Sequence, residues 1–378
     1  MRKRCVKYIC FVLTAVFLFL AAAPFPCEAA NAIQTGITLD CARRYYSVED
    51  IKKYIRLLSD SPAPFLQLHL TDDENVGVEC VYLGQTVKAA KKLSDGSYRN
   101  KQTKQKFLSR KQIRELLRYA ARKGVEIVPE IDMPAHMEGF FRLARGSLGA
   151  KYVKQISADA VKYPGELKIA GKKAIGFAKK LYAEYAELFA GCRYFHMGCD
   201  EFSSATQKQI VSYINTMSDF LEKKGFTVRI WNDLLRKDNI DKINSKIQVT
   251  YWSYDGDAQS ASVRKQRRKE RASVRDLQKK GFDILNYNSY YLYFTPSKEN
   301  CNRSDRDYMV NDVEKNWNLK KWDGDSGKTL SGKAHMIGAA VSVWGEDSSG
   351  VSADTIYKQV KPLYQAMKNK IKGLQKGA

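Results

Sequence analysis

Eight short apolar runs along the chain are typical of β-strands, and most of them end in polar or aromatic residues. They are residues 36–40, 65–70, 125–132, 194–201, 227–233, 247–252, 282–288 and 337–344. Most segments between them have helical period, as in residues 48–58, where Ile51, Tyr54, Ile55 and Leu58 recur on one face. Eight strands alternating with helices predict an α/β fold, a single (β/α)8 TIM barrel.

The run at residues 194–201 ends in two adjacent carboxylates, Asp200 and Glu201. Neighbouring side chains on a strand point to opposite faces, so the two are poorly placed to flank one bond symmetrically. A division of labour suits them better, with one carboxyl protonating a leaving group while the other holds part of the substrate. The alternative for an Asp-Glu pair is structural, because acidic residues at a helix N-terminus offset the helix dipole.

The mouth of a TIM barrel, formed by the carboxyl ends of its strands, carries the active site. Polar and aromatic residues at these ends should therefore converge there: Arg43, Asp72, Asp132, Asp200, Glu201, Trp231, Trp252, Tyr293, Trp344 and Glu346. Any one tryptophan alone would be ordinary core. Three of them at equivalent strand ends, together with carboxylates, indicate a sugar pocket.

Seven segments in the same order resemble glycoside hydrolase family 20, the β-N-acetylhexosaminidases. They are residues 39–43, 68–75, 129–136, 196–201, 250–257, 285–293 and 343–346. The resemblance runs from about Thr35 to the C-terminal helix and includes the segment His-Met-Gly-Cys-Asp-Glu that ends at Glu201. It implies the fold already expected and a set of residue roles.

In that family pattern, Glu201 is the general acid that protonates the glycosidic oxygen and later the base that activates water. Asp200 orients the substrate's 2-acetamido group, whose carbonyl oxygen attacks the anomeric carbon, and Tyr293 hydrogen-bonds that oxygen. This substrate-assisted route differs from the usual two-carboxylate scheme. Asp72 and His136 resemble a pair that tunes the proton affinity of the acid, although His136 could also be a hydrogen-bonded loop histidine.

The remaining family positions concern substrate binding. Trp231, Trp252 and Trp344 should wall the acetamido pocket and exclude water, which strengthens electrostatic stabilisation inside it. Arg43 and Glu346 should hold the outer hydroxyls of the terminal sugar, since a guanidinium fork suits vicinal oxygens.

Two features depart from the family pattern. Cys199 occupies a place where the family usually has glycine, directly before the catalytic pair, where the thiol could perturb the turn or fill a small gap. The segment 202–205 also differs from the pattern, so no contact with sugars beyond the cleaved bond is predicted from it.

Residues 1–30 are typical of a secretory signal peptide. A basic start with Arg2, Lys3, Arg4 and Lys7 precedes an apolar run at 9–23, which is short for a transmembrane helix of roughly 20 apolar residues. We therefore expect a secreted protein with one catalytic domain at residues 31–378, an uncleaved membrane tether being the alternative.

Cysteine and histidine spacing implies no cofactor and no metal. Five of the eight cysteines lie outside the leader, which is an odd number without a disulfide pattern, and no Cys-x-x-Cys occurs. The four histidines are scattered, and no glycine-rich phosphate loop is present.

The chain is strongly basic, with a formal net charge of +23 that becomes about +20 without the leader, which holds four basic residues and one acid. The densest basic run is residues 264–271. It is either a solvated helix face or a surface that adheres to anionic cell-envelope material. No specific nucleic acid is expected as a partner, because no binding motif or basic groove with interleaved aromatics accompanies the charge.

The resemblance implies a hydrolase of β-linked poly- or oligo-N-acetylglucosamine, with poly-β-1,6-N-acetylglucosamine of biofilm matrix as the expected polymer. Together with the leader, it leads us to expect a secreted monomer. The alternative is a non-catalytic glycan-binding or envelope-adhesion protein on the same barrel. Asp200, Glu201 and Tyr293 together favour catalysis, since a binder needs no proton donor beside an acetamido clamp.

Overall fold

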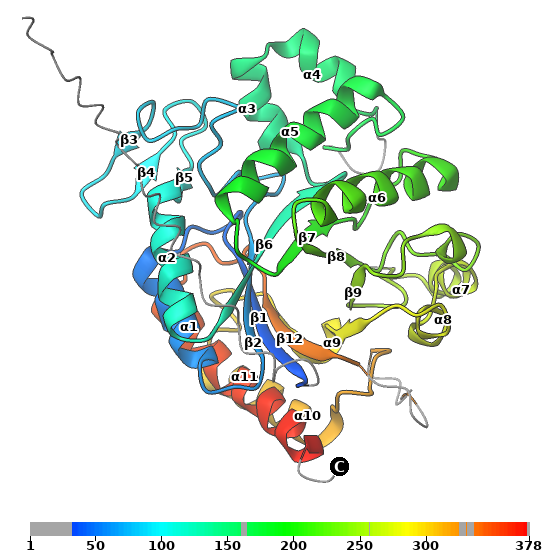
Figure 1. Ribbon diagram of the computed structural model, residues 1–378. Helices are drawn as coiled ribbons and strands as arrows, with labels where there is room; N and C mark the ends of the chain where they lie inside the picture. Colours follow the sequence, from blue (N-terminus) through cyan, green and yellow to red (C-terminus); the bar gives the residue numbers. More distant parts are fainter. Residues whose placement is uncertain (1–31, 160–164, 257, 325–329, 331–335, 376–378) are drawn as a thin grey trace, which may run out of the picture.

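The computed structural model describes residues 32–159, 165–256, 258–324, 330 and 336–375 (Figure 1). The predicted signal peptide at residues 1–30 lies outside this part of the chain. Among the residues that are described, no helix is both long and apolar enough to cross a membrane.

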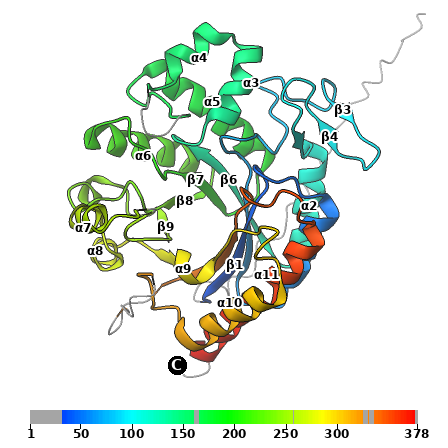
Figure 2. The same ribbon diagram turned by 180° about the vertical axis from the view of Figure 1, so that it is seen from behind.

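Eight parallel strands form a closed barrel at the centre of the molecule (Figures 1 and 2). They are β1 (Gln34–Asp40), β2 (Pro64–His69), β6 (Glu126–Met133), β7 (Tyr194–Gly198), β8 (Thr227–Trp231), β9 (Gln248–Tyr251), β10 (Ile284–Asn286) and β12 (Gly338–Val343). The barrel closes because β1 pairs with β12 in parallel register, with Ile37 opposite Val341. All eight predicted strands are present, and the prediction of a TIM barrel is confirmed.

Helices surround the barrel on the outside (Figure 1). They are α1 (Val48–Leu58), α2 (Arg110–Arg122), α3 (Glu138–Ser147), α4 (Ala150–Ile156), α5 (Lys172–Leu188), α6 (Gln207–Glu222), α7 (Ala261–Glu270), α8 (Val274–Lys279), α9 (Ser289–Leu292), α10 (Arg303–Asn316) and α11 (Ala353–Gln375). Helix α1 has the predicted bounds, because Ser47 and Asp50 form a capping box at its start and its four periodic apolar residues are buried against the barrel.

Two small features were not predicted. A three-stranded antiparallel sheet of β3 (Lys91–Lys92), β4 (Tyr98–Arg99) and β5 (Lys106–Phe107) lies in the long connection between β2 and α2. A two-residue strand, β11 (Tyr293–Phe294), pairs with β12 and so fixes the backbone of Tyr293 at the barrel mouth. Strands of two residues carry too little periodicity to be seen in the sequence.

Candidate active site

A pocket of about 240 Å³ opens at the carboxyl ends of the barrel strands. Its lining contains all ten residues predicted to be catalytic or substrate-binding, together with His69 and Thr295: Arg43, Asp72, His136, Asp200, Glu201, Trp231, Trp252, Tyr293, Trp344 and Glu346. Asp132 was expected at the mouth, but it is fully buried and does not line the pocket. The pocket is smaller than the roughly 300–1,000 Å³ of sites for drug-sized ligands, which suits a single sugar ring.

The chain turns sharply where the two adjacent carboxylates lie. Strand β7 ends at Gly198, and positive φ values follow at Gly198 (79°), Cys199 (72°) and Glu201 (43°). The expectation that Asp200 and Glu201 would point to opposite faces of a strand is therefore wrong, because the strand ends before both. A left-handed conformation is costly for a residue such as glutamate and is kept where the surrounding structure enforces it.

His136 lies between two pairs of carboxylates. Its Nδ1 is 3.5 Å from Asp72 Oδ1 and 3.4 Å from Asp73 Oδ2, and its Nε2 is 3.5 Å from Glu201 Oε2 and 3.8 Å from Asp200 Oδ2. Burial alone would lower the pKa of His136, but Asp72, Asp73 and Glu201 raise it well above the ordinary value. The imidazole is thus held as a cation in contact with both members of the catalytic pair.

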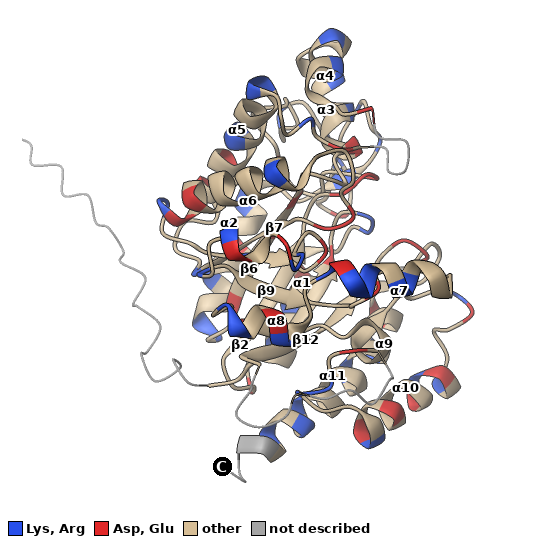
Figure 3. Ribbon diagram, turned by 90° about the vertical axis from the view of Figure 1, so that its right-hand side faces the viewer, with Lys and Arg blue, Asp and Glu red and all other residues tan. Residues whose placement is uncertain are grey.

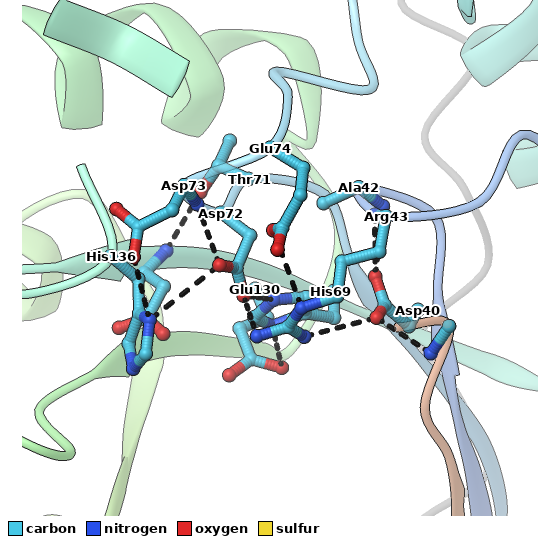
Figure 4. Close-up of polar contacts among 12 residues, drawn as sticks. Asp40, Ala42, Arg43, His69, Thr71, Asp72, Asp73, Glu74, Glu130 and His136 are labelled. Carbon is cyan, nitrogen blue, oxygen red and sulfur yellow. Dashed lines mark hydrogen bonds and ion pairs between the residues drawn. The ribbon is translucent and has the colours of Figure 1, made fainter. Parts of the chain in front are cut away.

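Asp72 is the centre of a second group of ion pairs (Figure 4). Arg43 Nη2 is 2.7 Å and His69 Nε2 is 2.8 Å from Asp72 Oδ2. Burial would raise the pKa of Asp72, but His136, His69 and Arg43 hold it well below its usual range. Asp72 therefore supplies a permanent negative charge behind His136.

Arg43 is fixed by acids from the end of β1 and from the loop after β2 (Figure 4). Besides Asp72, its Nη1 lies 3.0 Å from Asp40 Oδ2 and its Nε 3.3 Å from Glu74 Oε2. The same Asp40 oxygen accepts a hydrogen bond from the backbone N–H of Gly345 at 2.9 Å, which ties the end of β1 to the loop after β12. A guanidinium held in this way is pre-organised for the hydroxyl contacts expected of it.

The surroundings of Asp200 shift its pKa strongly upward. Burial raises its pKa, His136 opposes this, and Asp233 and Glu201 raise it further, to about 7. Its Oδ1 is buried without a hydrogen-bond partner, so one acceptor position is available to a ligand donor.

Aromatic side chains form the walls of the pocket. Tyr293 stacks on Trp252 with ring centroids 6.1 Å apart and planes 11° from parallel, and it meets Trp344 edge to face at 5.6 Å. Trp231 lies deeper, 6.0 Å from Trp344. The predicted tryptophan walls are thus brought together with the tyrosine beside them.

Two of the three tryptophans are held by buried acids that were not among the predicted site residues. Glu130 accepts a hydrogen bond from Trp231 Nε1 at 2.7 Å, and Asp233 accepts one from Trp252 Nε1 at 2.5 Å. Glu130 stands in the family segment 129–136, and Asp233 ends the predicted strand 227–233, so both positions offered a usable signal. Their partners did not, because indole contacts depend on the closed barrel.

Comparison with known proteins agrees with this arrangement of the site. Residues 35–360 match the description "Glycosyl hydrolase family 20, catalytic domain", which is well over half of the chain. The chain belongs to glycosyl hydrolase family 20.

The family-20 chain is similar to one solved structure and to two relatives in particular. The crystal structure of dispersin B is similar, with a TM-score of 0.86 and 40% sequence identity, covering 89% of this chain and 98% of that chain. Lacto-N-biosidase of Bifidobacterium bifidum is 26% identical over 282 residues, 67% of this chain and 22% of the relative. Beta-hexosaminidase 1 of Coccidioides posadasii is 23% identical over 364 residues, 84% of this chain and 57% of the relative. The chain thus spans less than two thirds of the length of these curated relatives.

The departure from the family-20 pattern at Cys199 has a simple structural outcome. Its φ of 72° is one that glycine adopts freely, and the side chain is fully buried with Sγ 3.6 Å from Met133 O. Burial raises the pKa of the thiol, and Asp132 and Asp200 raise it further. Cys199 therefore fills interior space as a neutral thiol while the turn is kept.

The basic run at 264–271 is only partly a solvated face. Helix α7 is rich in lysine and arginine (Figure 3) and has no buried residue, yet Arg267, Arg268 and Arg271 bond to other groups of the protein. Arg268 pairs with both Asp255 and Asp323, at 2.7 and 2.9 Å, and Arg267 Nη1 donates to the backbone oxygen of Asp255. Arg271 Nη2 lies 2.9 Å from Asp233 Oδ1, so this end of the run supports a wall of the pocket.

Three sets of Asp and His side chains bring ligand atoms within 4.8 Å of one another among the described residues: His69, Asp72 and Asp132; Asp72, Asp73 and His136; Asp132, His136 and Asp200. Asp72 is already bound by Arg43 and His69, and His136 bridges carboxylates. We therefore assign these sets to the ion-pair network of the pocket, and the absence of a cofactor stays a prediction.

Proposed function

We propose that the protein is a β-N-acetylhexosaminidase that removes β-linked N-acetylglucosamine with assistance from the substrate's own 2-acetamido group. The observation that carries the proposal is the convergence of Asp200, Glu201 and Tyr293 in one pocket walled by tryptophans. Family membership supports it, as does the completeness of the proton network around His136. A glycan-binding protein would not require a cationic histidine against a carboxyl pair.

In the first step, Glu201 gives its proton to the glycosidic oxygen as the bond to the anomeric carbon breaks. The acetamido carbonyl oxygen forms a bond to that carbon, which yields a cyclic oxazolinium ion with the leaving sugar as an alcohol. Asp200 accepts a hydrogen bond from the acetamido N–H, and its carboxylate is favoured as positive charge develops next to it. The Tyr293 hydroxyl donates to the carbonyl oxygen and aligns it.

In the second step, the Glu201 carboxylate takes a proton from water while the water oxygen attacks the anomeric carbon and the oxazolinium ring opens. Two inversions give overall retention. His136, 3.5 Å from Glu201, stabilises the carboxylate that exists between the two proton transfers, and Asp72 balances the charge of His136 from behind. The acid and its helpers therefore return to their starting protonation after each cycle.

The requirement for the acetamido group gives the test. A chromogenic N-acetyl-β-glucosaminide should be hydrolysed, whereas the matching glucoside and the free glucosaminide should be nearly inert. A thiazoline analogue of the cyclised intermediate should inhibit, because catalytic sites bind intermediate-like geometry more tightly than substrate. Equal rates on glucoside and N-acetylglucosaminide would refute the proposal.

For the natural substrate we propose poly-β-1,6-N-acetylglucosamine of a biofilm matrix, reached after secretion through residues 1–30. The likeness to dispersin B over nearly all of that chain supports this choice. Digestion of defined β-1,6 and β-1,4 oligomers with product sizing tests the linkage, and N-terminal sequencing of protein from culture medium tests the leader. Preference for β-1,4 oligomers would overturn the choice of polymer.

We also propose that part of the basic surface holds the protein on anionic envelope material. A groove of about 550 Å³ on α7 is lined by Lys237, Ala261, Arg264, Lys265, Arg268 and Lys269, and so is almost entirely cationic. Because Arg268 is committed to two aspartates, the adhesive charge is assigned to the lysines and Arg264. Exposed charges attract over roughly one Debye length, about 8 Å at physiological salt, so retention should weaken as salt rises.

A further inference from the structure

A buried carboxylate outside the pocket, Glu166, holds the loop that follows the catalytic pair. Its Oε1 accepts hydrogen bonds from the backbone N–H of Ser203 at 2.9 Å and from Ser203 Oγ at 2.8 Å. Its Oε2 accepts one from the backbone N–H of Ser204 at 2.8 Å. The side chain is fully buried, and these three donors start two residues after Glu201. Charge-assisted bonds of this kind are stronger than neutral ones.

The backbone on either side of Glu166 holds the other half of the acid machinery. The backbone N–H of Met137 donates to Gly165 O at 2.9 Å, and the N–H of Leu167 donates to Pro134 O at 2.7 Å. These two bonds fix the loop that carries His136. Residues 165–167 thus contact the His136 loop through their backbone and the Glu201 loop through one side chain.

Residues 165–167 therefore link the two loops whose side chains meet at the contact between His136 Nε2 and Glu201 Oε2, which are 3.5 Å apart. Glu201 has a φ of 43°, a conformation it would leave without external support. Phe202 packs in the core directly after Glu201, and the first hydrogen bonds after it among the described residues are those of Ser203 and Ser204 with the Glu166 carboxylate. Loss of the carboxylate would let the loop relax and the acid withdraw from its histidine.

We propose that Glu166 is a positioning residue that sets the approach of the acid Glu201 to His136. This inference rests on the proposed function. It also assigns a role to Ser203 and Ser204, which lie where the chain departs from the family pattern: they donate the hydrogen bonds that Glu166 accepts. Glu166 itself touches neither substrate nor reacting atoms, so its effect should be confined to steps that need the acid.

Leaving-group dependence separates this role from general structural support. In Glu166→Gln, one amide N–H must face a backbone N–H, so at least one anchor is lost. Turnover of an alkyl or disaccharide N-acetylglucosaminide, which needs protonation, should fall about 10–100-fold, part of the 10²–10⁴-fold that general acid catalysis supplies. The kcat/KM of a dinitrophenyl N-acetylglucosaminide reports only cleavage of the glycosidic bond, and this leaving group departs unprotonated, so kcat/KM should change less than about threefold.

Two further variants complete the test. Ser203→Ala removes one anchor bond and should give the same selectivity with a smaller loss, which serves if Glu166→Gln does not fold. Adding Glu166→Gln to Glu201→Gln should cause no further loss on any substrate, because no acid remains to be placed.

Glu79 provides a matched control. It is also buried, and its carboxylate accepts backbone N–H bonds from Val87 at 3.0 Å and Arg110 at 2.9 Å, but it does not line the pocket. Glu79→Gln should alter neither the leaving-group dependence nor the pH profile. Equal losses on both substrate types in Glu166→Gln and Ser203→Ala would overturn the inference while leaving the proposed function intact. A wild-type protein inert on every N-acetylhexosaminide would instead sink the proposed function.

Discussion

Replacing Arg271 by glutamine tests whether the end of the basic run is part of the pocket. The change removes the cation 2.9 Å from Asp233, which is itself buried and bonded to Trp252. Breaking a buried ion pair by deleting one partner costs about 3–5 kcal/mol. We expect the lower end, about 3 kcal/mol, because the Arg271 side chain is 13% exposed and Asp233 can take up a proton instead.

The sign of the pH dependence follows from Asp233. Burial already raises its pKa above the unfolded value despite the opposing effect of Arg271, and loss of Arg271 raises it further. The additional penalty on the ionised form is absent below the unfolded pKa of about 4 and grows as pH rises toward the folded pKa. The Arg271→Gln variant should therefore match wild type closely at pH 4 and be least stable relative to it at pH 8.

Urea unfolding at the two pH values measures this difference, and thermal unfolding at pH 8 should show a loss of roughly 5–10 °C for about 3 kcal/mol in a large domain. The same variant should lose about tenfold or more in kcat/KM on an N-acetylglucosaminide, because the Trp252 wall is no longer held through Asp233. Asp233→Asn added to Arg271→Gln should recover part of the stability, since no buried charge is left unpaired.

Arg264→Gln is the control: it also removes one charge, and Arg264 lies in α7, the helix that Arg271 caps. Its side chain is exposed and bonds only the backbone oxygen of Gln259 among the contacts seen, so stability and turnover should stay close to wild type. A loss in Arg264→Gln equal to that in Arg271→Gln would refute the reasoning. So would a deficit that does not change between pH 4 and pH 8.

Three further outcomes are expected. Glu201→Gln should keep substrate binding and lose about 10²–10⁴-fold in turnover of poor leaving groups, whereas near-normal turnover of an oligomer would remove it from the acid role. The acidic limb of the pH profile of kcat/KM should lie near the Asp200 pKa of about 7, because activity requires the carboxylate. His136→Asn removes the group that lowers this pKa, so the limb should move to higher pH. A limb that does not move would count against the assignment. Replacing Arg264, Lys265 and Lys269 by glutamine should let the protein elute from an anionic polymer column at lower salt, while its turnover of small substrates stays unchanged. Retention on the column that depends neither on salt nor on these changes would exclude adhesion through the groove.

Much of the fold could be predicted from local pattern. The eight apolar runs coincide with the eight barrel strands, and Ser47 with Asp50 marks the start of α1 as a capping box should. The position of site residues followed from one topological rule, that strand carboxyl ends meet at the barrel mouth. The two-residue strands and the turn at Glu201 did not follow, because pairing and a positive φ depend on neighbours that are distant in sequence.

By itself, the sequence determined the barrel, the family and most of the side chains that line the pocket, because periodicity and motif order are local properties of the chain. Only the tertiary structure decided how those side chains are charged and held. His136 is a cation because four carboxylates from two loops surround it, and Arg271 supports the pocket because the end of α7 lies against Asp233. Glu166 reaches residues 203 and 204 across a long stretch of chain. Electrostatic contacts act through space, so their partners are chosen when the barrel closes and not by sequence spacing.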